Sequence, residues 1–345
     1  MRSDNSVSVG RHTGVIVIGR NEGERLRRAF ASLPLAEVAV LYVDSGSTDG
    51  SVELATSMGI PVHCLDSSMS FSAARARLEG AKLLMSNNPD MEFVYFLDGD
   101  CTLKKSWLIN AIQFLELNQD VGIVCGKLEE EAPERSIYNR LSAIKWKAVQ
   151  IGEIDSCGGI FLIRRAIYEA VGGFNPLLMT GEEADLCLRV REKGYKVFRL
   201  DEYMARHDTD LVNFKDWWKR AVWGGYGDAL EYEIMSGKVS CGRRRETRSV
   251  LIWAIIMPLL CIFGSVGFAC VHESIFITFF ALLGYFLLIS KMSINRVKTG
   301  DSIRDAILYS CLNVIRKIPY AIGFFSYKIN RKSISKRPDP HAGRK

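Results

Sequence analysis

The sequence predicts an α/β protein in which a mainly parallel sheet is wound with helices and followed by an apolar C-terminal part. Over the first 210 residues, short β-branched apolar runs alternate with helix-like segments, which is typical of such a sheet. Three of the runs end on clusters of polar side chains, and this class of fold binds ligands at the carboxyl ends of its strands. Residues 250–271 then form 22 positions without a charge.

The individual strands and helices follow from the hydrophobic patterns. The apolar runs predict strands at residues 14–19, 38–43, 60–65, 93–97, 121–125 and 195–200. The segments between them predict helices at residues 24–33, 51–58, 72–84, 107–117, 137–149 and 165–171, and a further helix opens at residue 181. The strongly charged residues 129–135 are expected to form a loop.

The most informative of the polar clusters is Asp98-Gly99-Asp100, which follows the fourth predicted strand. Asp98 and Asp100 are two apart in an extended segment, so both carboxylates point the same way, and Gly99 lets the backbone approach a ligand. Such a pair suits a hard divalent cation held against phosphate oxygens, although a solvated turn has the same residues. The polar residues Asn21, Glu22 and Asp44 at the other strand ends favour a site.

Composition and charge exclude several classes of protein. Residues 291–345 hold 13 Lys and Arg against three Asp, or +10, which leaves −4 for the rest of this +6 chain. A basic tail beside apolar segments, without a nucleic-acid motif, favours an anionic membrane surface over nucleic acid. The nine cysteines form no C-x-x-C pair and no zinc-site spacing, which fits a reducing cytosol. Residues 1–13 contain no apolar signal-peptide core, so we expect the catalytic portion to remain cytosolic.

The C-terminal third is predicted to enter a membrane. Residues 250–271 are long enough to cross a bilayer, and residues 275–289 form a second, shorter apolar segment. Basic residues flank both segments, so we expect a hairpin with both ends in the cytoplasm, in a multi-pass inner-membrane protein. A buried hairpin of a soluble domain is the alternative. Residues 303–327 mix apolar and basic side chains and are expected to lie on the membrane surface as an amphipathic helix.

These patterns divide the chain into four parts. We predict a catalytic domain at residues 1–212, a basic interfacial connector at 213–248, a transmembrane helical hairpin at 249–290, and a basic juxtamembrane segment with a tail at 291–345.

Five motifs in order give the chain a family resemblance. They are residues 17–22 (VIGRNE), 43–51 (VDSGSTDGS), 97–100 (LDGD), 172–174 (GGF) and 181–189 (GEEADLCLR). Each is weak alone, but their order and spacing over residues 13–210 resemble the family 2 glycosyltransferases, which are inverting enzymes with the GT-A fold.

The resemblance implies a donor site at the strand ends. Asn21, Glu22 and Asp44 would hold the nucleotide of a nucleotide-sugar, and a carboxylate suits the uracil N–H, which favours a UDP-sugar. Arg75 or Arg77 would be the basic residue near the nucleotide, unless both belong to a solvated helix face.

It also implies a metal site and a base. Asp98 and Asp100 match the family's D-x-D element, which would bind Mn²⁺ or Mg²⁺ against the donor diphosphate, mainly through Asp100, and His207 would complete the site. Glu183 stands where the family has the aspartate that deprotonates the acceptor hydroxyl, and Asp185 is its rival. The alternative is that these acids only favour a helix N-terminus.

The function that these expectations favour is a metal-dependent, membrane-anchored hexosyltransferase. It would transfer a sugar from a nucleotide-sugar to a hydroxyl of a lipid-linked or growing surface glycan at the cytoplasmic membrane face. A polyprenyl-phosphate glycosyltransferase is one alternative, although its ionised acceptor needs no base. An inactive membrane scaffold with the same fold is another. A sugar nucleotidyltransferase fits poorly, because residues 20–23 do not form a glycine-rich basic phosphate loop.

Overall fold

The computed structural model describes residues 12–234, 248–268 and 275–330. These residues form two compact units. The first unit comprises residues 12–131 and 149–209, and the second comprises residues 132–148 and 210–330. The helix predicted at residues 137–149 therefore belongs with the C-terminal helices, although it lies in the middle of the catalytic domain in sequence.

The first unit is built on one mixed, mainly parallel sheet. In the described chain this sheet has nine strands, in the order β3-β2-β1-β4-β8-β6-β9-β5, with β7 paired to β9. Strands β1, β2, β3 and β4 are mutually parallel, whereas β8 runs antiparallel to β4 and β6. The strands are β1 (Thr13–Gly19), β2 (Ala39–Asp44), β3 (Val62–Cys64), β4 (Phe93–Asp98), β5 (Cys101–Leu103), β6 (Val121–Glu130), β7 (Gly152–Glu153), β8 (Phe161–Arg164) and β9 (Lys196–His207).

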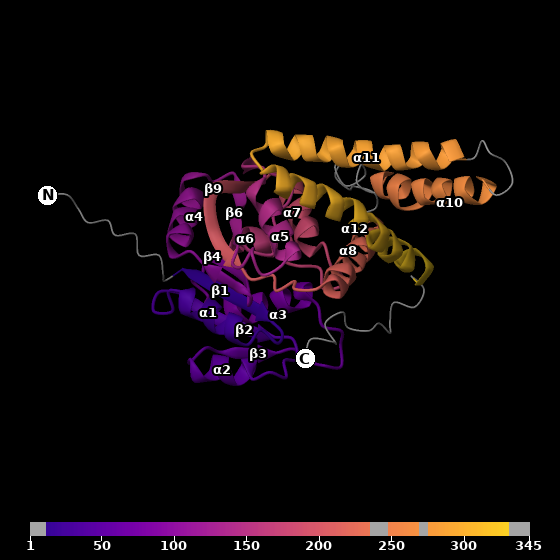
Figure 1. Cartoon of the computed structure of the whole chain (residues 1–345). Coiled ribbons are helices and arrows are strands. Elements are labelled where there is room, and N and C mark those ends of the chain that lie inside the picture. The colour runs from indigo at the N-terminus through magenta and orange to yellow at the C-terminus, as the bar shows by residue number, and fades with distance from the viewer. Residues whose placement is uncertain (1–11, 235–247, 269–274, 331–345) are drawn as a thin grey trace. The chain divides into compact units, whose positions relative to one another are not determined.

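Six helices of the first unit connect these strands in the described chain (Figure 1). Ser72 caps the longest of them, because its side chain accepts a hydrogen bond from Arg75 N at 3.1 Å. The helix that carries the acidic motif follows Gly181, whose φ of 77° is in the left-handed region. The helices are α1 (Glu24–Ser32), α2 (Ser51–Ser57), α3 (Ala73–Asn87), α4 (Lys105–Leu117), α6 (Arg165–Ala170) and α7 (Glu182–Glu192).

An aromatic cluster in the core connects the central strands to the GGF motif. Phe96 of β4 packs against Phe161 of β8 at 5.1 Å and against Phe174 at 5.2 Å between ring centroids. Tyr168 lies 5.7 Å from Phe96 and completes the cluster. All four side chains are buried. This packing fixes Phe174 beside the ends of the central strands.

The structure confirms the α/β class and changes several boundaries. The third strand is only Val62–Cys64, and β6 continues to Glu130, so the first two residues of the predicted 129–135 loop are strand. Strand β9 continues past residue 200 to His207, with shifts of register against β6, so His207 ends a strand instead of following a loop. The short strands β5 and β7 carry no periodic pattern and were not predicted.

The second unit is helical in its described part. Helix α12 crosses α8 closely, since a Cβ added at Gly225 would lie 1.9 Å from the Tyr320 carbonyl oxygen. The predicted surface helix at residues 303–327 thus uses one face, including Leu312 and Tyr327, for packing inside the protein. The elements are α5 (Ile137–Lys147), α8 (Phe214–Ile234), a π-helical turn η1 (Ile252–Ile256), α10 (Met257–Phe268), α11 (Ile275–Lys298) and α12 (Ile303–Asn330).

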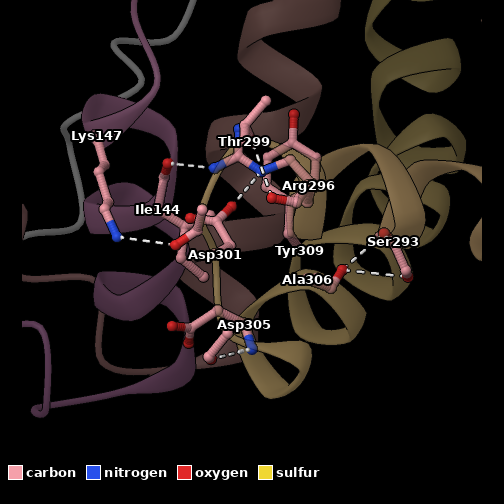
Figure 2. Close-up of polar contacts among 12 residues, drawn as sticks. Ile144, Lys147, Ser293, Arg296, Thr299, Asp301, Asp305, Ala306 and Tyr309 are labelled. Atoms are coloured by element: carbon pink, nitrogen blue, oxygen red, sulfur yellow. Dashed lines mark hydrogen bonds and ion pairs between the residues drawn. The ribbon is translucent and has the colours of Figure 1, made fainter.

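Polar contacts connect α5 to the region of the turn between α11 and α12 (Figure 2). Arg296 donates from Nε to Asp301 at 2.5 Å and from Nη2 to the Ile144 carbonyl at 2.7 Å. Arg140 adds an ion pair with Asp305 at 2.9 Å. Arg296, predicted as part of a basic membrane flank, therefore also holds this turn together.

The helix lengths correct the predicted transmembrane hairpin. Within the described residues one helix, Thr278–Lys298, is long and apolar enough to cross a membrane, while Arg248–Ile262 is shorter. Only 6% of the apolar window of the longer helix is buried, so it is not a core helix. The described part of the predicted span 250–271 is divided between η1 and α10, and the turn at residues 272–273 lies outside the described residues. One candidate span, not two, is supported.

Candidate active site

The loops after β1 and β2 are joined by hydrogen bonds at the carboxyl edge of the sheet. Asn21, which has a φ of 56°, accepts a hydrogen bond from Thr48 N at 2.7 Å and donates its own N–H to Ser47 Oγ at 3.0 Å. Asp49 accepts from Gly23 N at 2.9 Å. These contacts bring the VIGRNE and VDSGSTDGS motifs together in one place.

Asp44 is buried and forms part of this loop structure. Its Oδ1 accepts the Tyr42 hydroxyl at 2.9 Å, and its Oδ2 accepts the backbone N–H groups of Gly46 and Ser47 at 2.9 and 2.8 Å. Burial and the nearby Asp44 carboxylate raise the Tyr42 pKa, so this hydroxyl remains a donor. Asp44 thus lies where the prediction puts it, and it shapes the turn that follows β2.

Arg75 lies in the first turn of α3 and holds the preceding loop. Its Nη1 donates to the carbonyl oxygens of Asp66 and Met69 at 2.9 and 3.2 Å, and its Nε donates to Glu79 at 2.7 Å. This loop carries Phe71, whose ring lies 5.2 Å from the Arg20 guanidinium. Arg75 is buried, so it is not on a solvated helix face. It contacts the loop that carries Phe71.

Asp98 is the last residue of β4, and Asp100 lies two residues further on. The two carboxylates contact different side chains. Gly99 donates its N–H to the Ile18 carbonyl at 2.8 Å, which places the two aspartates beside the end of β1. Asp100 Oδ2 lies 3.1 Å from His207 Nε2. Asp98 Oδ1 instead accepts a hydrogen bond from Arg77 Nη2 at 2.8 Å. The structure therefore places His207 beside Asp100 and directs Asp98 toward a second cluster.

The first cluster has the donor types of a cation site. Asp100, Cys101 and His207 present ligand atoms that all lie within 4.8 Å of one another. Burial raises the pKa of the Cys101 thiol well above its usual value, and Sγ donates to Asp100 at 3.3 Å. Burial alone would raise the Asp100 pKa, but His207 outweighs it and the pKa is lowered, so Asp100 is ionised. A carboxylate and an imidazole fit Mn²⁺ or Mg²⁺.

The second cluster surrounds Arg77 of α3. Arg77 Nη1 lies 2.7 Å from Glu182 Oε1 and 3.3 Å from Glu183 Oε1, and Nη2 binds Asp98. The guanidinium therefore contacts three carboxylates, and the Arg77 side chain is only 3% exposed. Its carbon Cζ lies 5.6 Å from the ring centroid of Phe174.

Glu183 has the most perturbed carboxyl group of this cluster. Burial raises its pKa, repulsion by Glu182 raises it further, and Arg77 opposes both, with a net rise from 4.5 to about 8. Its side chain is 19% exposed, so it can still meet a ligand. A carboxyl with a pKa near neutrality is suited to exchange a proton.

Asp185, the rival of Glu183, is held by an arginine. Arg189 donates to Asp185 Oδ2 from Nη2 at 2.5 Å and from Nε at 3.1 Å. The same guanidinium donates to the carbonyl oxygens of Val171 and Gly173 at 2.5 and 2.8 Å. Arg189 thus connects α7 to the turn before Phe174, and Asp185 binds the same guanidinium. The four-residue spacing from Asp185 to Arg189 is a signal that the sequence analysis did not use.

Gly159 lies close to Asp98, to the predicted base Glu183 and to Arg77. A Cβ built on Gly159 would lie 3.0 Å from Asp98 Oδ2 and 3.1 Å from Glu183 Oε1. It would also lie 2.3 Å from Arg77 Nη2. Asp98 Oδ2 and Glu183 Oε1 therefore face the same small region, which no side chain fills from this position.

Comparison with solved structures defines the class. The mannosyltransferase PcManGT from Pyrobaculum calidifontis, solved with GDP-Man and Mn²⁺, matches 92% of this chain and 87% of its own with a TM-score of 0.55 at 15% identity. The fold is therefore of the GT-A type found in glycosyltransferases.

The family follows from sequence comparison. Residues 14–172 match the model of glycosyl transferase family 2, and residues 142–210 match that of the N-terminal domain of galactosyltransferase. Residues 14–172 thus match the family 2 glycosyltransferases, which supports the resemblance of the chain to that family.

Curated relatives support this assignment at low identity. The pre-mycofactocin glycosyltransferase of Mycobacterium tuberculosis is 25% identical over 231 residues, which are 62% of this chain and 46% of the relative. The O-antigen chain rhamnosyltransferase RfbN of Salmonella typhimurium is 25% identical over 186 residues, 50% of this chain and 58% of the relative. The chain thus spans about half the length of these relatives.

Proposed function

We propose that this protein is a metal-dependent, inverting glycosyltransferase that transfers a sugar from a nucleotide-sugar to an acceptor hydroxyl. One observation carries the proposal: two carboxyl groups whose pKa values are shifted in opposite directions lie at the same edge of the sheet. Asp100, with a lowered pKa, is paired with His207, whereas the pKa of Glu183 is raised to about 8. The reaction needs both, because one group must hold charge near the leaving diphosphate and another must accept a proton.

Glu183 is the proposed general base. It would take the proton of the acceptor hydroxyl while the hydroxyl oxygen attacks the anomeric carbon and the nucleoside diphosphate leaves with the bonding electrons. Its side chain is 19% exposed, which leaves it accessible to a hydroxyl. Asp185 is the less suitable base, because both Nε and Nη2 of Arg189 donate to its Oδ2.

Asp100 and His207 would hold Mn²⁺ or Mg²⁺. When bound, the cation neutralises charge that develops on the leaving diphosphate. Asp98 is 31% exposed, and Arg77 binds its Oδ1, so we propose that its Oδ2 contacts the donor or the cation. The Mn²⁺ and GDP-Man named for the structural relative support this assignment of the cation and of the donor class.

The nucleotide is proposed to bind beside Asn21, Glu22 and Asp44. These residues lie at the ends of β1 and β2, and the hydrogen bonds that join the two loops would hold them in place for a base and a ribose. We propose a UDP-sugar as the donor and a lipid-linked or growing glycan as the acceptor. The relative that builds an O-antigen chain supports the acceptor class.

We propose that the second unit attaches the protein to a membrane. The exposed side chains of α11 include Phe279, Phe280 and Phe286, each at least 60% exposed, which is unusual for a helix in water. A lipid-linked acceptor would then be delivered at the same surface.

A donor screen tests the proposed function. The full-length protein is incubated with Mn²⁺ and a panel of UDP-, GDP- and dTDP-sugars, and release of the nucleoside diphosphate is measured. Release should require Mn²⁺ and should fall by about 100-fold or more in Asp100→Asn, because the lost charge no longer holds the cation. Release that is insensitive to both changes would refute the metal assignment.

A further inference from the structure

We infer that Arg77 is a positioning residue that holds Asp98 and Glu183 in a fixed relation, and that the absence of a side chain at Gly159 is what allows this arrangement. The inference rests on the proposed function, and it assigns Arg77 a role different from the nucleotide contact that the sequence predicts.

The contacts of Arg77 leave little of its guanidinium for a ligand. Nη2 binds Asp98 at 2.8 Å, and Nη1 binds Glu182 at 2.7 Å and Glu183 at 3.3 Å. The side chain is 3% exposed, so a nucleotide would have to displace protein carboxylates to reach it. A guanidinium presents its donors in a rigid planar fork, so one residue sets the directions of several carboxylates at once.

These carboxylates come from distant parts of the chain and would repel one another without Arg77. Asp98 ends β4, whereas Glu182 and Glu183 open α7. Three acids around one cation leave an excess of negative charge, which is consistent with the raised pKa of Glu183. Arg77 therefore links the donor side of the site to the proposed base.

Arg77 is also confined by its packing. The Phe174 ring lies 5.6 Å from Cζ, and that ring is fixed in the aromatic cluster of the core. The backbone of Gly159 lies so close that a Cβ there would come within 2.3 Å of Nη2. The guanidinium could give way only by losing its bond to Asp98. An alanine at Gly159 should therefore disturb the same contacts as a change of Arg77 itself.

The neighbouring glycine is a matched control. A Cβ at Gly158 would meet no atom within 4 Å, and neither Gly158 nor Gly159 has a positive φ. Both therefore accept alanine without backbone strain. Gly159→Ala and Gly158→Ala make the same chemical change one residue apart, and only the first reaches Arg77.

The experiment compares Arg77→Lys, Gly159→Ala and Gly158→Ala with the wild type. For each protein we measure kcat, the donor KM, the Kd of the nucleoside diphosphate with Mn²⁺ by calorimetry, and the melting temperature. Arg77→Lys keeps the charge but loses the fork, and it should lower kcat by about 100-fold, as expected for misplaced reacting groups. Gly159→Ala should do the same while keeping Arg77. In both, KM and Kd should change much less than kcat, because the proposed nucleotide contacts at the ends of β1 and β2 are kept.

The outcomes separate this inference from the proposed function. Gly158→Ala should match the wild type in all four measurements. Equal kcat values for Gly159→Ala and Gly158→Ala would overturn the inference, as would a large rise in KM and Kd with unchanged kcat in Arg77→Lys, which would make Arg77 a nucleotide contact. Both results leave the proposed function intact. A wild type without turnover of any nucleotide-sugar would instead overturn the proposed function, and the inference with it.

Discussion

Single residues of the same chemical type receive different roles from their surroundings. Asp100 is beside His207, Asp185 is beside Arg189, and Glu183 is buried next to another glutamate. These partners hold the pKa of Asp100 low and raise the pKa of Glu183 to about 8. The same type of side chain thus provides Glu183, the proposed base with a pKa near neutrality, and Asp100, which stays ionised.

The raised pKa of Glu183 predicts a pH-dependent rate. The base acts only when ionised, and its ionised fraction rises about tenfold per pH unit below its pKa. With a pKa of about 8, kcat/KM should rise steeply from pH 6 and level off above pH 8. The measurement is a pH–rate profile with saturating Mn²⁺. A profile that is flat between pH 6 and 8 would contradict the assignment.

The same shift predicts a pH-dependent stability. A carboxyl whose pKa is higher in the folded than in the unfolded protein contributes stability at low pH, and this contribution is lost as the pH rises from 4.5 to about 8. Glu183→Gln, which mimics the neutral form, should melt like the wild type at pH 5 and higher by a few degrees at pH 9, about 2–4 °C for each kcal/mol. Equal melting temperatures at pH 9 would count against the raised pKa.

The positions of most candidate site residues in the fold could be predicted from the sequence, but the side chains that they contact could not. Asp98, Asp100 and Glu183 were proposed from strand ends and motif order, because a parallel sheet brings strand ends together, and His207 was proposed from the family resemblance. The separation of Asp98 from Asp100 could not be predicted. It depends on Arg77, which lies 21 residues from Asp98 and 105 from Glu182, and such distances carry no local pattern.

At the scale of elements, the periodic patterns predicted the long strands and helices and failed where tertiary pairing extends or creates a strand. Strand β9 continues to His207 because β6 and β5 pair with it, and the two-residue β7 exists only through its pairing with β9. Local sequence does not encode these pairings.

The crossing of α8 and α12 makes a sharp prediction about two adjacent glycines. A Cβ at Gly225 would lie 1.9 Å from the Tyr320 carbonyl oxygen, whereas a Cβ at Gly224 would meet nothing within 4 Å. Gly225→Ala should therefore destabilise the second unit by about 1–3 kcal/mol through overpacking. Gly224→Ala should be neutral, or stabilising by up to about 1 kcal/mol through helix propensity. Thermal unfolding of both variants is the measurement, and equal stabilities would contradict the close crossing.

At the scale of the whole molecule, the chain consists of two units that are not continuous in sequence. Residues 132–148 lie between strands of the first unit but belong to the second. Hydrophobic patterns describe residues that are close in sequence, so they cannot show that residues 132–148 belong to the second unit. The contacts of Arg140 with Asp305 and of Arg296 with Ile144 do show it. The four consecutive parts predicted from sequence do not describe this arrangement.

The exposed face of α11 predicts membrane association of the full chain. Phe280 and Phe286 are 63% and 65% exposed in a helix long enough to cross a bilayer. Phe280→Lys with Phe286→Lys should move the protein from the membrane to the soluble fraction, because Phe286 lies near the middle of the span, where a charge costs about 2.5–3.5 kcal/mol. Fractionation after carbonate extraction is the measurement. A double variant that remains in the membrane fraction would argue against α11 as the anchor.

We propose that a cation site at Asp100 and a base at Glu183 act together in sugar transfer. The most direct test is a measurement of nucleoside diphosphate release in the presence of acceptor, with and without Mn²⁺, for the wild type and Glu183→Gln. We predict that removal of Mn²⁺ abolishes release and that Glu183→Gln lowers kcat by about 10²- to 10⁴-fold with little change in donor KM. Wild-type turnover by Glu183→Gln would contradict the account.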